Sequence, residues 1–331
     1  MTATGPGTAG DVPRGIPRVL SIAGTDPTGG AGLQADLKSI AAHDGYGMAV
    51  VTALVAQNTH GVRAVHVPDV RFLRQQLDAV SDDVDIDAVK IGMLGTAEVV
   101  TTVTAWLREH RPPVVVVDPV MVATSGDRLL DEDAERAMTA LFGLADLVTP
   151  NRAELRVLAG LAGRAPEAAG PSWSLEAARL VARTWDVLVL AKGGHDDGPT
   201  SDDVLVAPSG ATRTFTAPRV DTTNTHGTGC SLSSAIATLA ARHGDWELAV
   251  GIAKPWLTAA LGGADALHVG SGNGPIDHGV LVRQAVGDES STDRWWHDVE
   301  GVLRETIGCA FLVGLRDGSL DVGAFERYLA Q

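Results

Sequence analysis

Cys230 ends the run Asn-Thr-His-Gly-Thr-Gly-Cys, residues 224–230, whose residue types fit phosphoryl transfer. Gly227 and Gly229 are two apart, so the backbone can coil tightly enough for successive N–H groups to converge on one point. Residues 231–237 are predicted to be helical, and the positive end of that helix would face the same point. A thiol beside an anion-binding turn indicates a phosphoryl-transfer site, although glycine turns before helices also serve as plain connectors.

A second pair of residues could bind a cation. Asn151 and Glu154 are three apart at the predicted start of a helix, hence on one face. An amide and a carboxylate there can hold Mg²⁺ through water. Asn at the N-cap with Glu three residues later is equally a helix-start signature, and the local chemistry favours this capping interpretation. The run Lys192-Gly193-Gly194 follows a predicted strand and could meet a nucleotide phosphate or form a surface turn.

A third group of residues could surround a small planar substrate. The glycine-rich stretch 23–32 leads into Gln34-Ala35-Asp36 and either lets the backbone approach a ligand or is an ordinary strand-to-helix loop. It matches neither the phosphate-binding nor the dinucleotide glycine pattern, so a nucleotide would need a different cradle. Gln57 ends a strand with an amide that suits the edge of a heteroaromatic ring, but such amides are also common at exposed strand ends. Met93 could line a pocket, although Met on a buried strand is more often core.

Strands alternate with helices along the chain. Apolar or β-branched runs predict strands at 19–23, 49–56, 88–94, 114–121, 147–149 and 187–191. Helical spacing is present at 33–42 and 70–80, and a hairpin is predicted from 204–206 and 212–217. The run 114–117 is apolar on both faces, which is typical of a parallel sheet covered by helices on both sides. We therefore expect a doubly wound α/β domain, which binds its ligands beyond the carboxyl ends of the strands.

Composition sets limits on the function. The chain has 331 residues, 45% of them apolar, and a net charge of −15, which argues against a nucleic-acid surface. The two cysteines, Cys230 and Cys309, exclude a disulfide framework and fit a cytoplasmic protein. Residues 1–16 lack an apolar segment and are predicted to be a flexible tail rather than a signal peptide. No apolar run reaches membrane-spanning length, so we expect neither a membrane nor a nucleic-acid partner.

Taken in order, the motifs resemble a family. From Arg18 to about His278 the chain looks like the hydroxymethylpyrimidine/phosphomethylpyrimidine kinase of thiamine biosynthesis, within the ribokinase-like superfamily. The resemblance lies in six motifs, at residues 23–38, 52–59, 90–94, 149–154, 192–195 and 224–230. It implies a ribokinase-like, mostly parallel sheet with helices on both faces. It also implies two ATP- and Mg²⁺-dependent phosphorylations, first of the hydroxymethylpyrimidine and then of its monophosphate, by a homodimer.

The resemblance also implies roles for particular residues. Those expected to bind the pyrimidine are Gln57, Gly24, Asp36 and Met93. The expected anion hole for the transferred phosphoryl group comprises Gly227, Thr228 and Gly229. Lys192 and Asn224 would bind the nucleotide, while Mg²⁺ would be organised by Asn151, Glu154 and Asp118.

Cys230 occupies the position at which most ribokinase-like sugar kinases carry an aspartate base. A helix N-terminus lowers the pKa of a thiol, so we expect a thiolate that can accept the hydroxyl proton near neutral pH. The second transfer has an ionised phosphate as acceptor and needs little base.

The end of the chain differs from the kinase. Residues 17–282 are assigned to the kinase domain, 283–293 to a polar linker and 294–331 to a helical appendage. The appendage resembles the start of the TenA-like thiaminase II family at 311–320 and 325–331, without that family's active-site residues. An unrelated helical pair is the alternative.

Two other functions stay open at this point. Pyridoxine or pyridoxal kinase shares the scaffold and a hydroxymethylated ring, and a non-catalytic pyrimidine-binding module would bind ligand without ATP turnover. The glycine turn and the Asn151–Glu154 pair argue against the second alternative, because ligand capture alone needs neither.

Overall fold

One mixed sheet forms the centre of the fold. The computed structural model describes residues 15–121, 132–163, 173–194 and 198–287. Within these ranges the strand order is β3-β2-β1-β4-β5-β6-β7-β8-β9, parallel from β2 to β7 and antiparallel at both edges. The strands are β1 Arg18–Gly24, β2 Tyr46–Asn58, β3 Gly61–His66, β4 Ala88–Ile91, β5 Val115–Val117, β6 Leu147–Val148, β7 Leu188–Ala191, β8 Thr200–Val206 and β9 Thr212–Pro218.

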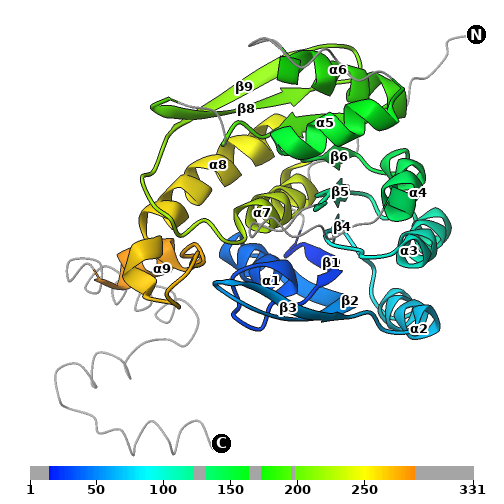
Figure 1. The fold of residues 1–331 in the computed structure, drawn as a ribbon, viewed down its shortest axis with the longest axis horizontal. Helices are drawn as coiled ribbons and strands as arrows, with labels where there is room; N and C mark the ends of the chain where they lie inside the picture. The colour runs from blue at the N-terminus through cyan, green and yellow to red at the C-terminus, as the bar shows by residue number, and fades with distance from the viewer. Residues whose placement is uncertain (1–14, 122–131, 164–172, 195–197, 288–331) are drawn as a thin grey trace, which may run out of the picture. The chain divides into compact units, whose positions relative to one another are not determined.

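Helices cover both faces of this sheet (Figure 1). The helices that pack into one hydrophobic cluster on one face are α2 Val70–Ser81, α3 Ala97–His110, α4 Glu132–Phe142, α5 Arg152–Leu161 and α6 Trp173–Trp185. Those on the other face are α1 Gly32–Ala42, α7 Thr228–His243 and α8 Trp246–Gly262, and a short 3₁₀ turn at Ala264–Leu267 follows α8. The ribokinase-like α/β fold expected from the sequence is confirmed.

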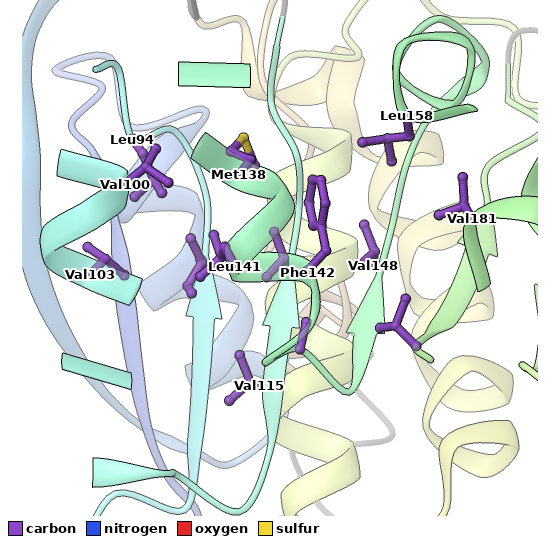
Figure 2. Packing of buried hydrophobic residues seen from close by; sticks show 14 of the residues in the cluster. Leu94, Val100, Val103, Val115, Met138, Leu141, Phe142, Val148, Leu158 and Val181 are labelled. Carbon is purple, nitrogen blue, oxygen red and sulfur yellow. The ribbon is translucent and has the colours of Figure 1, made fainter. Parts of the chain in front are cut away.

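The core of the α2–α6 face shows why the strands are apolar on both sides. Figure 2 shows Met138, Leu141 and Phe142 of α4 over the strands that carry Val115 and Val148. Each of these strands has apolar residues on its other face as well, and Val116 and Leu147 are completely buried there. Burial on both faces keeps β5 and β6 apolar, so the polar residues of this part of the sheet lie in the loops that follow these strands.

Helix α7 is the element that carries the sequence's most informative motif into the interior. Every residue from Ser231 to Ala241 is buried, because α7 packs against α1, α8 and the sheet. Its first residue is Thr228, and Gly227 precedes it with φ of 81°, in the left-handed region that favours glycine. The buried helix therefore begins directly at the predicted anion-binding turn.

Three details differ from the sequence prediction. Strand β3 had not been predicted, because its side chains are largely exposed and Arg63 and His66 interrupt any apolar run. Strands β4 and β5 end at Ile91 and Val117, earlier than expected, so that the residues after them form the loops of the site. Helix α9, Val280–Gly287, includes residues 283–287, which had been assigned to the linker.

Contacts divide the chain into two compact units, 1–278 and 279–331. The second unit contributes α9 to the described residues. The predicted tail up to residue 14, the rest of the linker and the TenA-like appendage lie outside the described residues, and these domain assignments stay predictions. No helix in the described ranges combines the length and apolar character needed to span a membrane.

Candidate active site

A cavity of about 920 Å³ opens beyond the carboxyl ends of the parallel strands. Its walls come from the loops after β1, β4, β5, β6 and β7, from the β2–β3 hairpin, from the start of α7 and from α8. All the predicted site residues except Asp36 and Asn224 line it. The fold therefore brings together side chains that are up to about 200 positions apart in the sequence, as expected for a ligand site in an open α/β sheet.

The β2–β3 hairpin forms one wall, which suits a flat ring. Val55, Gln57 and Val62 lie on its inner side, and Gly24 at the end of β1 and Met93 in the loop after β4 continue the wall. A register shift between Ala56 and Gln57 marks a β-bulge, and bulges re-aim the side chains beside them. The wall is thus apolar with one amide, a combination that can bind a heteroaromatic ring and read its edge.

Asp36 does not contribute to this wall, which corrects the prediction that it binds the pyrimidine. It is completely buried and its carboxylate accepts hydrogen bonds from Lys90 (2.7 and 2.9 Å), Ser21 (2.6 Å) and Ser234 (2.8 Å). Lys90 is also completely buried, and its charge needs this partner. The pair lies in the interior behind the cavity, and its charges influence the cavity electrostatically, without direct contact.

The glycine turn of residues 227–229 forms a second wall. A side chain at Gly227 would place its Cβ 1.8 Å from the carbonyl oxygen of Gly30, so glycine is the one residue that fits. The hydroxyl of Thr228 donates to the Thr225 carbonyl across 2.6 Å and fixes the turn. The Thr228 amide also donates to this carbonyl, across 3.3 Å. Gly227, Thr228 and Gly229 thus line the cavity at the start of a helix, the part of a helix whose N–H groups suit an anion hole.

Asp26 holds the glycine-rich loop 23–32 against this turn, a role that sequence reasoning missed. Its fully buried carboxylate accepts hydrogen bonds from His226 (2.8 Å), from the amide and hydroxyl of Thr28 (2.9 and 2.7 Å), and from the amides of Gly30 and Ala31 (3.0 and 2.8 Å). Burial alone would raise its pKa, but the bonds from His226 and Thr28 outweigh burial and hold the pKa of Asp26 well below its usual range. The signal in the sequence was an aspartate opening a turn rich in Pro, Thr and Gly.

Cations and carboxylates meet at the third wall. Lys192 donates to Asp118 across 3.0 Å, and a Cβ at Gly229 would lie 3.1 Å from the Lys192 Nζ and 3.3 Å from Asp118 Oδ2. The pair therefore touches the anion-binding turn. Burial lowers the pKa of Lys192, but the charges of Asp118 and Glu154 raise it by more. The net rise in this pKa keeps the Lys192 side chain protonated.

Asn151 and Glu154 form a capping box, which confirms the interpretation favoured from local chemistry. The Asn151 side chain accepts from the Glu154 amide (2.9 Å) and the Glu154 side chain from the Asn151 amide (2.8 Å). Both residues also line the cavity. Burial raises the pKa of Glu154, the charge of Lys192 opposes this rise, and the negative charge of Asp118 adds to it. A cation near both carboxylates would reduce the repulsion between their charges.

Cys230 lines the cavity, but its expected low pKa is wrong. Burial raises the pKa of the Cys230 thiol to about 11, with Asp36 and Asp118 adding to the rise and Lys90 and a hydrogen bond with the Gly32 backbone opposing it. The helix end is a local property that the sequence shows, whereas the carboxylates come from α1 and from the loop after β5. At neutral pH the group is therefore a thiol in the unliganded protein.

Asn224 does not line the cavity. Its side-chain amide donates to Asp265 across 2.6 Å, and its oxygen accepts from the Gly274 amide across 2.9 Å. Both ends of the side chain are thus engaged within the protein, and the expected contact of Asn224 with a nucleotide stays a prediction.

The sequence of this site was compared with known proteins. The family model described as phosphomethylpyrimidine kinase matches residues 26–277, which include all the residues that line the cavity except Gly24 and Thr25. The chain belongs to the phosphomethylpyrimidine kinase family.

Among curated relatives of this family, the hydroxymethylpyrimidine/phosphomethylpyrimidine kinase of Salmonella typhimurium is 47% identical over 78% of this chain and 96% of its own. The thiamine biosynthesis multifunctional protein ThiED of Corynebacterium efficiens is 46% identical over 95% of this chain but 47% of its own. For the Corynebacterium glutamicum protein of the same name, this chain spans 36% of the length. The chain thus spans less than half of these multifunctional relatives.

Solved structures place the phosphomethylpyrimidine kinase family beside another group of vitamin kinases. The phosphomethylpyrimidine kinase of Clostridium difficile is 35% identical, covers 74% of this chain and 99% of its own, and has a TM-score of 0.64. An ADP complex of Bacillus subtilis pyridoxal kinase is 30% identical, covers 81% of this chain and 99% of its own, and has a TM-score of 0.72.

One further ion pair lines the cavity, and both of its residues lie outside the six family motifs. Lys254 of α8 donates to Asp203 of β8 across 2.6 Å, and Asp203 accepts from the Gly193 amide across 2.9 Å. Both side chains are buried and line the cavity beside the apolar Leu257 and Leu261. The signal was a lysine inside an otherwise apolar helix, which is unusual unless the charge has a partner. The pair fixes Gly193 next to Lys192.

Proposed function

We propose that this protein transfers a phosphoryl group from ATP to 4-amino-5-hydroxymethyl-2-methylpyrimidine and then a second one to the monophosphate, giving the diphosphate for thiamine biosynthesis. The observation that carries the proposal is that Gln57 and the turn ending in Cys230 line the same cavity. One wall suits an aminopyrimidine ring, and the wall formed by the turn suits the phosphoryl group in transfer. The names of relatives that the chain covers almost completely support the choice of ring.

In the first transfer the substrate hydroxyl oxygen bonds to the γ-phosphorus of ATP. The bond from that phosphorus to ADP breaks, and its electron pair leaves with ADP. We assign Cys230 to accept the hydroxyl proton, and its pKa of about 11 makes the thiolate a strong base that is scarcely populated at neutral pH. The amides of Gly227, Thr228 and Gly229 stabilise the charge that develops on the transferred group.

In the second transfer the acceptor is the phosphate that the first transfer made. Its oxygen is already ionised, so no base is needed, and the difficulty is instead the repulsion between two phosphate groups. Lys192 faces the anion-binding turn with a firmly held positive charge. We propose that Lys192 and the turn together reduce this repulsion and that Lys192 also binds the nucleotide phosphates.

Magnesium is part of the proposal because of the carboxylates that face the cavity. Within the described residues no three His, Cys, Asp or Glu side chains form a metal cluster, so water and phosphate oxygens would supply most ligands, as Mg²⁺ prefers. Asp118 and Glu154 would hold the ion through water, and the raised pKa of Glu154 is the observation that fits a cation there. Asn151 would act by holding Glu154 in its capping box. The bound ion would supply charge neutralisation on the nucleotide phosphates.

Separate measurements of ADP release with each acceptor test this function. We expect turnover with the hydroxymethylpyrimidine and with its monophosphate, and ³¹P NMR should show the diphosphate. Pyridoxine is the matched control, because its kinase is the alternative favoured by the higher TM-score of the pyridoxal kinases. Turnover of pyridoxine without diphosphate formation would favour that alternative, and acceptor binding without ADP release would favour a non-catalytic module.

We further propose that the protein is a cytoplasmic homodimer. Strand β2 supports an interface between copies, because its Leu54 is 50% exposed and its Tyr46 is 63% exposed. Sedimentation velocity with Leu54→Lys as the comparison tests the dimer.

A further inference from the structure

The segment 268–275, which follows α8 and its 3₁₀ turn, holds the tip of the β2–β3 hairpin. The amide of Asn273 donates to the Thr59 carbonyl across 2.9 Å, and the amide of Gly272 donates to the Thr59 hydroxyl across 3.1 Å. The ring of His60 pairs with the Ser271 hydroxyl across 3.0 Å. The hairpin that carries Gln57 is therefore fastened at its tip by backbone donors from a distant part of the chain.

The same segment also holds the residues that lead into the anion-binding turn. The side-chain oxygen of Asn273 accepts from the Thr225 amide across 3.0 Å. The Gly274 carbonyl accepts from the His226 amide across 3.0 Å, and the Gly274 amide donates to the Asn224 side chain across 2.9 Å. These bonds fix the three residues immediately before Gly227.

The approach is too close for side chains on the segment's glycines. A Cβ at Gly272 would lie 2.2 Å from the Thr59 carbonyl oxygen, and one at Gly274 would lie 2.3 Å from the Asn224 side-chain oxygen. The glycines thus serve close backbone packing, and the segment is a fitted connection rather than a loose surface loop.

Asn273 is the residue at which the two sets of bonds meet, with its backbone on the hairpin and its side chain on the turn. We propose that Asn273 is a positioning residue that couples the ring-binding hairpin to the anion-binding turn, so that acceptor and nucleotide bind cooperatively. This inference rests on the proposed function, since it assigns the two walls to acceptor and phosphoryl group. Asn273 itself lies outside the cavity lining and acts through Thr59 and Thr225.

The position of Asn273 between the hairpin and the turn explains why such a link would affect phosphoryl transfer. Transfer requires the acceptor oxygen and the phosphoryl group to be held about 3–3.5 Å apart. They are held by elements that do not follow one another in the sequence, a hairpin at the sheet edge and a helix start. Because the connection is closely fitted, a ligand that favours one position of either element also favours one position of segment 268–275, and hence of the other element.

Calorimetric titration of the acceptor, with and without the non-hydrolysable nucleotide AMP-PCP and Mg²⁺, tests the proposal. The acceptor is the one that the wild-type protein phosphorylates in the turnover assay, so a wrong substrate is recognised there, before any variant is made. We expect the nucleotide to tighten acceptor binding in wild type by on the order of tenfold. In Asn273→Ala we expect this factor to fall to about one to twofold while each ligand alone binds within about twofold of wild type.

Two variants separate coupling from a merely structural effect. Asn273→Asp keeps an oxygen acceptor for the Thr225 amide and should restore most of the factor. Ser271→Ala removes a contact of the exposed His60 and should leave the factor unchanged. If Asn273→Ala does not fold, Thr59→Val, which removes one bond at the hairpin tip, should lower the factor by a smaller amount. A wild-type factor of one, or an unchanged factor in Asn273→Ala or in Thr59→Val, would overturn the proposal.

Discussion

The Asp26 carboxylate and the His226 ring, 200 residues apart in sequence, are joined by a hydrogen bond of 2.8 Å. This bond connects the glycine-rich loop after β1 to the turn before α7. The backbones of the two glycine stretches interlock beside it, with Gly30 directly against Gly227. Neither stretch can therefore move without the other.

Asp26→Asn should weaken both transfers. An amide nitrogen would face donors that the carboxylate now accepts from, and we expect a loss of about 2–3 kcal/mol in stability. Displacement of the turn should lower kcat by roughly a hundredfold with either acceptor. Thermal melting and turnover measure the two effects. Exposed Asp69→Asn, which changes an N-cap outside the cavity, is the matched control, and equal losses of activity in both variants would contradict the assignment.

Gly227→Ala should abolish both activities. Its φ of 81° strains any other residue, and its Cβ would meet the Gly30 oxygen at 1.8 Å. Gly160→Ala in α5 is the control, because no atom lies within 4 Å of its Cβ and alanine favours a helix by about 1 kcal/mol. Circular dichroism and ADP release should show a slightly stabilised, active control. An active Gly227→Ala enzyme would contradict the anion hole.

Sequence periodicity predicted most strands of the sheet and its covering helices, because these depend on local patterns that the chain carries. The family resemblance predicted eleven of the residues that line the cavity. Residues that act through distant partners were not predictable in this way. Asp36 follows a motif that lines the cavity, yet its place on α1 directs it to the buried Lys90. The segment around Asn273 has the composition of a surface loop, and nothing local indicates that it meets Thr59 and Thr225.

Glu154→Gln should raise the Mg²⁺ concentration needed for half-maximal turnover severalfold. The substitution keeps the size of the side chain but removes one of the two carboxylates that face Lys192. Glu176→Gln, which changes a first-turn glutamate of α6 outside the cavity, is the control. Turnover at a series of Mg²⁺ concentrations checks the prediction, and identical curves for the two variants would remove Glu154 from the proposed metal site.

Stability should fall as the solution is acidified, in part because of His278. Burial lowers the pKa of His278 from 6.5 to about 4, so the unfolded chain binds this proton more readily than the folded one does. The contribution is present in full above pH 6.5 and is lost as pH falls from 6.5 to 4, by about 3 kcal/mol. Denaturant unfolding at several pH values should show that the free energy of unfolding changes less between pH 6.5 and 4 in His278→Gln than in wild type. An unchanged pH dependence of the free energy of unfolding would indicate that other groups, such as His43, cause the acid sensitivity.

Cys230→Ser should reduce the first transfer far more than the second. The hydroxyl acceptor must lose a proton and the phosphate acceptor has none to lose, so only the first step uses the sulfur as a base. Because the pKa of Cys230 is raised to about 11, the wild-type rate of the first transfer should keep rising with pH well above neutrality, whereas the second transfer should not follow it. In Cys230→Ser this rise should be lost. Ser233→Ala, one turn further along α7, is the control, since its hydroxyl bonds only to the carbonyls of Gly229 and Cys230 within the described residues. Equal losses in both transfers, or a pH rise that survives in Cys230→Ser, would show that Cys230 shapes the cavity without accepting the proton.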